Sequence, residues 1–199
     1  TGLNQNTLYD VYVRSVCVSG DTTRWSPLTV FRTDCSEINT LPWSEDFSGY
    51  GSGTGVRHPC FPSASTYSTS YPYITSTNSP SGAGGSMYMY CYDYNGVGYY
   101  TYFALTKIGD NLSLDSLQLT FKAYQSSNYN SPVIVGVMTD PTDMSTFVPV
   151  DTAFCTTTST WEAFEVPLSP YSGEGKYIGL MTKRIGTSTT VCPYIDDLV

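Results

Sequence analysis

Alternation of apolar and polar residues runs through the chain and predicts a protein built from short β-strands. The clearest case is residues 86–94, where Met87, Met89 and Cys91 occupy every second position and tyrosines fill the positions between them. A period of two is typical of a half-buried strand, because successive side chains point to opposite faces. Residues 133–138 are apolar along their whole length, which indicates a central strand covered on both sides. Further strands are expected at 7–16, 29–33, 117–124, 146–150, 161–168, 176–181 and 194–199.

Turn-forming residues separate these segments and leave little room for helices. Residues 48–86 are rich in Gly, Ser, Thr, Pro and Tyr and predict loops with short strands, and the one helical hint covers residues 112–117. Many short strands divided by turn residues predict an all-β sandwich. Residues 36–41 are mostly polar and are expected to link a small N-terminal part, residues 1–35, to a larger one, residues 42–199.

Charge and hydropathy exclude two classes of partner. The 199 residues carry a net charge of −8 with only nine Lys and Arg, so we expect no binding to nucleic acid or to an anionic membrane face. No apolar run approaches the length of a membrane span, so no membrane insertion is expected. The opening Thr-Gly-Leu-Asn resembles neither an initiator nor a signal peptide, and we expect an internal fragment of a longer, exported protein.

Two acidic clusters at the ends of the larger part are the best candidates for a metal site. Glu45 and Asp46 lie near its start, and Asp196 and Asp197 near its end. The first and last strands of an antiparallel sandwich are often neighbours, and converging carboxylates favour a hard cation such as Ca²⁺. Adjacent strand residues point to opposite faces, so one acid of each pair is expected to ligate, with Glu45 and Asp197 favoured. The alternative is a pair of polar strand ends that face water.

Tyrosine supplies the best candidate for ligand binding. Ten of the 18 tyrosines fall between Tyr67 and Tyr102. A tyrosine offers a flat face for stacking on a sugar ring together with a hydroxyl group, at small conformational cost. Tyr99, Tyr100 and Tyr102 follow a Gly-rich turn and are predicted to be ligand contacts on a loop. The tyrosines that alternate within 86–94 are expected to pack in the core or in an interface instead.

The six cysteines fit disulfides in an oxidising compartment better than a zinc site, because there is no Cys-x-x-Cys pair and only one histidine. Free buried thiols are the alternative. Cys17 and Cys35 bracket one expected hairpin and are predicted to pair.

Catalysis has little support, and we expect no catalytic residues. The single histidine, His58, lies in a constrained Pro-rich loop, which is a weak signal for a Ser/His/Asp triad. Glu162, Glu165 and Glu174 could supply the paired acids of a glycosidase, but their spacing does not distinguish them from solvated carboxylates.

Residues 1–35 resemble the last strands of a fibronectin type III module. The run from Gly2 to Tyr9 matches the approach to the penultimate strand, and the resemblance makes Tyr9 the tyrosine of the corner that this family carries. The placement of Cys17 and Cys35 resembles a variant found in surface proteins of the Bacteroidetes. The earlier strands of such a module are missing, so this part is expected to be incomplete.

Residues 42–199 resemble the MAM-like jelly roll of the cleaved-adhesin family, the modules that follow the protease domains of gingipains. The resemblance implies a calcium-stabilised jelly-roll β-sandwich in a secreted or cell-surface adhesin that binds glycan or protein ligands on host or matrix, beside neighbouring modules of the same chain. A structural spacer and an accessory domain of a secreted hydrolase are the alternatives. The matching pieces, in the order of the family, are residues 41–47, 85–87, 119–124, 135–141, 161–164, 175–180 and 195–198.

This sequence departs from the family in two places. Ser48 stands where the family usually carries an acid, and the Asp/Gly-rich stretch of the gingipain modules is replaced by the Tyr-, Ser- and Gly-rich residues 63–102.

Overall fold

The protein consists of two compact units. The computed structural model describes residues 2–3, 7–80, 84–127, 130–187 and 189–199, and these divide into a small unit, Thr1–Ser36, and a large unit, Glu37–Val199. The boundary falls within residues 36–41, the segment predicted to be a linker. Most of that segment belongs to the large unit, because Ile38 is buried and forms a parallel bridge with Ile108.

The small unit is a β-hairpin of β1 (Leu8–Val11) and β2 (Thr29–Arg32), which pair antiparallel. Tyr9 stacks on Phe31 across the pair, with ring centroids 5.8 Å apart. Beyond Val11 the two arms stay joined by hydrogen bonds as far as a bridge between Val16 and Thr22. The hairpin leaves large apolar side chains exposed, as expected for two strands that cannot bury a core by themselves. Its assignment to a fibronectin type III module stays a prediction.

The predicted pairing of Cys17 with Cys35 is wrong. Cys17 is an exposed free thiol, whereas Cys35 is disulfide-bonded, as is Cys60. The register of the hairpin explains the error. Arg32, three residues before Cys35, lies opposite Leu8, and Cys17 is nine residues further along the first arm. Nine extended residues cover roughly 30 Å, far beyond the reach of a disulfide.

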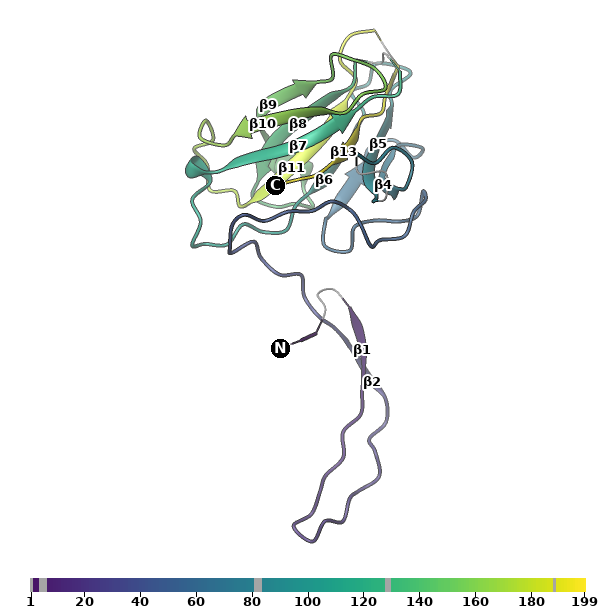
Figure 1. Cartoon of the computed structure of the whole chain (residues 1–199), viewed down its shortest axis with the longest axis vertical. Helices are drawn as coiled ribbons and strands as arrows, with labels where there is room; N and C mark the ends of the chain where they lie inside the picture. Colours follow the sequence, from purple (N-terminus) through teal and green to yellow (C-terminus); the bar gives the residue numbers. More distant parts are fainter. Residues whose placement is uncertain (1, 4–6, 81–83, 128–129, 188) are drawn as a thin grey trace. The chain divides into compact units, whose positions relative to one another are not determined.

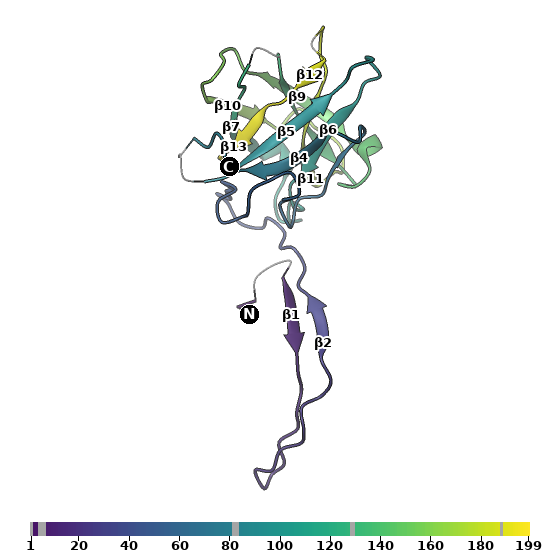
Figure 2. The ribbon, with the colours of Figure 1, turned by 90° about the vertical axis from the view of Figure 1, so that its right-hand side faces the viewer.

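The large unit is a β-sandwich of two antiparallel sheets (Figures 1 and 2). One sheet has the order β10-β7-β13-β5-β12, with β4 on the free side of β5, and the other has the order β3-β6-β11-β8-β9. The first sheet contains β4 (Tyr71–Thr75), β5 (Ser86–Tyr92), β7 (Gln118–Tyr124), β10 (Glu162–Pro167), β12 (Thr190–Val191) and β13 (Tyr194–Asp196). The second contains β3 (Ser63–Ser65), β6 (Tyr100–Ala104), β8 (Pro132–Met138), β9 (Val148–Phe154) and β11 (Tyr177–Lys183). Two 3₁₀ turns, η1 (Leu114–Ser116) and η2 (Met144–Thr146), complete the described elements.

The alternation read from the sequence sets the inner and outer faces of these sheets. Met87, Met89 and Cys91 of β5 are buried in the core, and the tyrosines between them are half-buried on the other side. The apolar run of β8 is buried at every position, as predicted for a central strand. The helical hint at residues 112–117 corresponds to the short turn η1.

The first and last segments of the large unit lie side by side. Glu45 and Leu198 form an antiparallel bridge with two backbone hydrogen bonds of 2.9 Å. This contact brings both acidic clusters to the end of β13, an inner strand of the first sheet, as the nearness of first and last strands in an antiparallel sandwich predicts.

Candidate functional site

The neighbouring terminal segments gather the four candidate acids but send their side chains in different directions. Phe47 and Asp197 both have left-handed backbone conformations, with φ of 52° and 49°. Such values are uncommon for residues other than glycine, and they turn the chain just after the first acidic pair and at the second acid of the other pair. As a result, the carboxylates of Glu45 and Asp197, the pair favoured from the sequence, are held by other partners.

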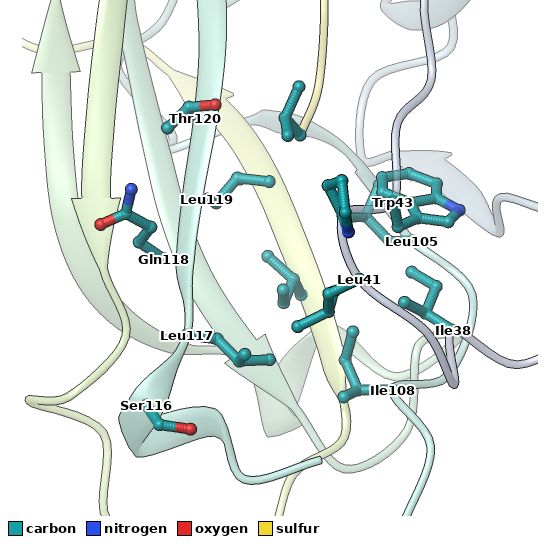
Figure 3. Close-up of a pocket in the computed structure, with 13 residues that line it drawn as sticks. Ile38, Leu41, Trp43, Leu105, Ile108, Ser116, Leu117, Gln118, Leu119 and Thr120 are labelled. Atoms are coloured by element: carbon teal, nitrogen blue, oxygen red, sulfur yellow. The ribbon is translucent and has the colours of Figure 1, made fainter.

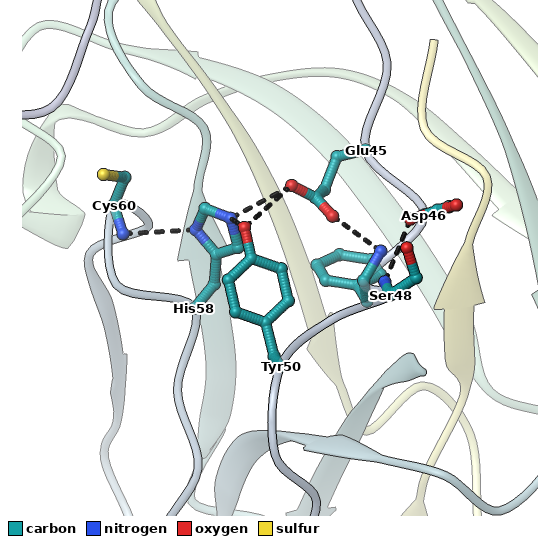
Figure 4. Close-up of polar contacts among 7 residues, drawn as sticks. Glu45, Asp46, Ser48, Tyr50, His58 and Cys60 are labelled. Atoms are coloured by element: carbon teal, nitrogen blue, oxygen red, sulfur yellow. Dashed lines mark hydrogen bonds and ion pairs between the residues drawn. The ribbon is translucent and has the colours of Figure 1, made fainter. Parts of the chain in front are cut away.

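Glu45 and Asp197 each have their own polar partners, and Figure 4 shows those of Glu45. One oxygen of Glu45 accepts a hydrogen bond from the Phe47 backbone N–H, and the other lies 3.1 Å from Nε2 of His58. Asp197 forms an ion pair with Lys122, with Nζ and Oδ2 2.8 Å apart. These contacts are structural and leave the other two acids as the candidates for a cation.

Asp46 and Asp196 form what we call the acidic corner, together with Ser79. Asp196 is 1% exposed and accepts hydrogen bonds from its neighbour's N–H at 2.8 Å and from Ser79 Oγ at 3.4 Å. Burial, opposed in part by the hydrogen bond from the Asp197 N–H and reinforced by the charges of Asp197 and Asp46, raises the pKa of Asp196 to about 7. Hydrogen bonds from Ser48 hold the pKa of Asp46 below its usual range. The backbone N–H of Ser48 donates one of these hydrogen bonds to Asp46 Oδ1, at 2.9 Å.

The acidic corner offers oxygen donors alone, which suits a hard cation rather than zinc. Among the described residues, no three His, Cys, Asp or Glu side chains form a metal-binding group. A cation here would need hydroxyl, backbone or water oxygens beside the two carboxylates. Ser79 supplies one, and the neighbouring Asn78 has a left-handed φ of 57°.

His58 lies in a closed polar network that does not resemble a catalytic triad (Figure 4). Its Nε2 lies 2.8 Å from the Tyr50 hydroxyl as well as near Glu45, and its Nδ1 accepts a hydrogen bond from the Cys60 backbone N–H at 3.2 Å. The ring stacks on Phe61 with centroids 3.6 Å apart. Burial, together with the charge of Glu45, raises the pKa of Tyr50 to about 12. Both ring nitrogens are therefore engaged in holding the loop of residues 45–61.

The outer face of the first sheet carries a line of aromatic side chains that crosses its strands. Tyr73 on β4 lies opposite Tyr88 on β5, Tyr88 opposite Tyr194 on β13, and Tyr194 opposite Tyr124 on β7. Trp161, the residue before β10, lies next to Tyr124. We call these five residues the aromatic row. From Trp161 to Tyr73, the distances between successive ring centroids are 5.4, 5.5, 4.5 and 5.2 Å.

The members of the aromatic row point away from the core and are all half-buried. The residues that alternate with them, such as Ile74, Met87 and Ala123, are buried between the sheets. At one end of the row, Trp161 is next to Glu162, whose carboxylate accepts hydrogen bonds from the N–H and hydroxyl groups of Thr156 and Thr157 at 2.7–2.9 Å. This network fixes the loop that presents the indole.

The three predicted ligand tyrosines lie apart from the aromatic row, and the prediction for Tyr102 is wrong. Tyr102 belongs to β6, is 2% exposed and donates its hydroxyl to the Pro141 carbonyl. Tyr100 packs against the same buried cluster. Tyr99 contacts Tyr67, with ring centroids 4.8 Å apart. The expected loop is a strand in the middle of the second sheet, where both faces are covered.

Most of the aromatic row was not predicted from the sequence. Which residues are neighbours across strands depends on strand order and register, and the sequence alone shows neither. The signal that was present is the period of two, which puts Tyr124 and Tyr194 on the outer side of their strands. The tyrosines of 86–94, expected to pack in a core or interface, divide between this outer face and solvent. Tyr94 is 68% exposed.

A separate apolar cleft of about 260 Å³ opens between β7 and the segment that leads into the large unit (Figure 3). Leu41, Trp43, Leu117 and Leu119 are among its lining residues, and none of the side chains that line it is ionisable. The cleft therefore lacks the acid and base groups that catalysis would require.

Within the described residues, no helix has the length and apolar character of a membrane span. No family model and no curated protein matches the sequence.

Solved structures are similar to this chain in fold. The K2 cleaved adhesin domain of Lys-gingipain matches with a TM-score of 0.59 and 10% identity, over 78% of this chain and 96% of that domain. The K1 domain from Porphyromonas gingivalis matches with a TM-score of 0.53 and 16% identity, over 78% of this chain and 95% of the domain. The K3 domain from the same organism matches with a TM-score of 0.52 and 18% identity, over 79% of this chain and 96% of the domain. The chain thus shares its jelly-roll fold with the cleaved adhesin domains.

Proposed function

We propose that this chain is a non-catalytic, adhesin-type module that binds glycans through the aromatic row. The observation that supports the proposal most directly is the alignment of Trp161 and four tyrosines on one outward face. Such side chains stack on the apolar faces of sugar rings, and their polar groups can bond sugar hydroxyls. The five rings are half-buried and form one contiguous outward-facing surface, and contiguous apolar surfaces often mark binding sites.

A protein ligand would also fit an aromatic face, but two features favour a glycan. The five rings follow a line across the strands, with Tyr71 and Tyr90 beside one part of it, whereas stable protein interfaces are built around a hydrophobic centre within a broad patch. The tyrosines also contact one another from strand to strand, so they present a continuous ribbon rather than a pocket for one anchor.

We also propose that the acidic corner holds a structural Ca²⁺ ion. The buried Asp196 carboxyl supports this, because Lys122 forms its ion pair with Asp197 instead. The ion would supply positive charge between Asp46 and Asp196 and tie the two terminal segments of the large unit together. Its role would be stability, since the corner contains no group engaged in bond-making chemistry.

An extracellular location, secreted or on a cell surface, agrees with the disulfide-bonded Cys35 and Cys60, because such bonds persist in oxidising compartments. This location, the host or matrix origin of the ligand and attachment to neighbouring modules belong to the proposal.

A glycan array tests the proposed function. We expect the wild-type chain to retain one class of glycan and the double variant Trp161→Ala, Tyr124→Ala to lose it at least tenfold. Tyr12→Ala, which removes an exposed tyrosine of the small unit, is the matched control and should bind as the wild type does. Absence of any glycan binding, or equal binding by the double variant, would contradict the proposal and favour a spacer module.

A further inference from the structure

We propose that the ligand is a single soluble chain of uncharged sugars that lies across the strands, with one sugar ring over each strand it crosses. This inference rests on the proposed function and adds the direction, length, charge and physical form of the ligand. Four observations on the aromatic row support it: the strand register, the distances between ring centroids, the angles between ring planes, and the charged residues nearby.

Register and spacing set the direction. Each neighbouring pair of tyrosines in the row is also a pair of opposed strand residues, so the row runs perpendicular to the strands. Strands lie about 4.8 Å apart, and the ring centroids of the row follow that spacing at 4.5–5.5 Å. A pyranose in an extended glycan advances the chain by a similar length. A glycan in this orientation would place successive sugars over successive aromatic side chains.

The alternative direction, along β5, offers a different set of contacts. Tyr88, Tyr90 and Tyr92 share one side of that strand, and Tyr94 follows its end by two residues. The centroids of Tyr88 and Tyr90 are 6.2 Å apart, as are those of Tyr92 and Tyr94. These centroid distances are longer than those within the row, and a glycan in this direction would meet fewer aromatic side chains. The two directions depend on different residues, so mutation can separate them.

Ring orientation indicates a flexible, dissolved chain rather than a crystalline surface. The planes of successive rings differ by 38°, 80°, 42° and 71° from Trp161 to Tyr73. A flat polysaccharide face requires coplanar rings, whereas a single chain can twist to meet each ring in turn. The twist of the sheet also rotates each strand, and the side chains that it carries, relative to its neighbour.

The electrostatic surroundings favour uncharged sugars. Burial raises the pKa values of Tyr73, Tyr88 and Tyr194, so these phenols stay neutral. Lys122, which lies on the same face, is paired with Asp197, and Arg57 lies over Tyr71, outside the row. The chain as a whole carries a charge of −8, which repels polyanions.

Calorimetric titration with neutral oligosaccharides tests this inference. The probes are β-1,4-linked glucose, xylose and mannose series, each from disaccharide to hexasaccharide. For at least one series we expect the affinity to rise several-fold with each added sugar up to the pentasaccharide and then to level off. Trp161→Ala and Tyr73→Ala remove opposite ends of the row, and each should shorten the length at which affinity levels off by about one sugar.

Tyr94→Ala is the matched control, because Tyr94 is exposed, follows β5 by two residues and lies outside the row. It should leave the titrations unchanged, and thermal unfolding of each variant shows whether the fold is kept. Loss of affinity in Tyr94→Ala together with unchanged binding by Trp161→Ala would place the chain along β5 and overturn the inference.

Three further outcomes would overturn it: affinity that is already maximal with the disaccharide, binding to insoluble polysaccharide only, or array binding confined to charged or branched glycans. In each of these cases glycan binding itself stands, so the proposed function survives. Failure to bind any glycan on the array overturns both.

Discussion

At the scale of single residues, His58 is the side chain on which the entry loop of the large unit most depends. It is 5% exposed and contacts Glu45 and Tyr50 through one ring nitrogen and the Cys60 backbone through the other. We predict that His58→Ala lowers the free energy of unfolding by about 3 kcal/mol, because a largely buried carboxylate and a buried N–H lose their partner. Chemical denaturation measures the change. Tyr50→Phe, which removes one hydroxyl, should cost about 1 kcal/mol, and equal losses for the two variants would contradict this account.

The cysteines give a second prediction at this scale. Burial raises the pKa of Cys91 to about 11 and that of Cys155 to about 12, and it also raises that of Cys192. Thiolates are the reactive species, so these buried groups should react slowly with iodoacetamide in the folded protein. Exposed Cys17 should be labelled first. Mass spectrometry of digested protein gives the order. Rapid labelling of Cys155 before unfolding, or of Cys35 before reduction, would be inconsistent with the structure.

The residue scale also shows why the pair of acids favoured from the sequence, Glu45 and Asp197, differs from the pair at which we propose the cation, Asp46 and Asp196. The period of two correctly indicated that adjacent acids diverge. Which member of each pair meets its counterpart depends on the left-handed turns at Phe47 and Asp197. Phe47 belongs to a residue type that rarely adopts this conformation, so nothing local indicates the first turn. Aspartate adopts it more often, but most aspartates do not, so Asp197 is only a weak signal for the second turn.

At the scale of elements, the second sheet contains a close approach that glycine makes possible. Gly136 of β8 lies opposite Gly179 of β11, and the Phe147 ring covers both. A Cβ on Gly136 would lie 2.5 Å from the Phe147 ring and 2.7 Å from the Val148 carbonyl oxygen. We predict that Gly136→Ala costs about 2 kcal/mol of unfolding free energy, as expected for overpacking against backbone. Gly55→Ala, which meets nothing within 4 Å, is the control for thermal unfolding. Equal stability of the two variants would contradict this packing.

The strands also differ in whether the pattern of apolar and polar residues was enough to predict them. Strands with one covered face, such as β5 and β7, were recognisable from alternation alone. Strand β6 was mistaken for a loop because it is covered on both sides and contains a threonine. That residue, Thr101, is buried and donates its hydroxyl to the Tyr90 carbonyl, so its polarity is satisfied inside the protein and no alternation remains.

At the scale of the whole molecule, the acidic corner joins the first and last segments of the large unit, so its charge state should govern stability. The folded state holds the Asp196 proton more tightly than the unfolded state, since the pKa is raised from 3.8 to about 7. Without a cation, stability should therefore fall as pH rises through this window, because the folded state then binds more protons than the unfolded state. A bound Ca²⁺ ion favours the ionised carboxylate, so its stabilising effect should be small near pH 5 and full above about pH 7.

Thermal unfolding with Ca²⁺ and with a chelator, across this range of pH, measures both trends. We predict that Asp196→Asn removes the fall in stability with pH and also the response to Ca²⁺. Asp110→Asn, at an exposed acid that forms an ion pair with Lys107, should retain both. The corner also adjoins the aromatic row, because Tyr194 lies two residues before Asp196 on the same strand, β13. Chelation should therefore weaken glycan binding as well as stability. If neither the midpoint of thermal unfolding nor the glycan affinity changes with Ca²⁺ at pH 8, this corner holds no structural ion. The buried Asp196 carboxyl would then be accommodated only by being protonated.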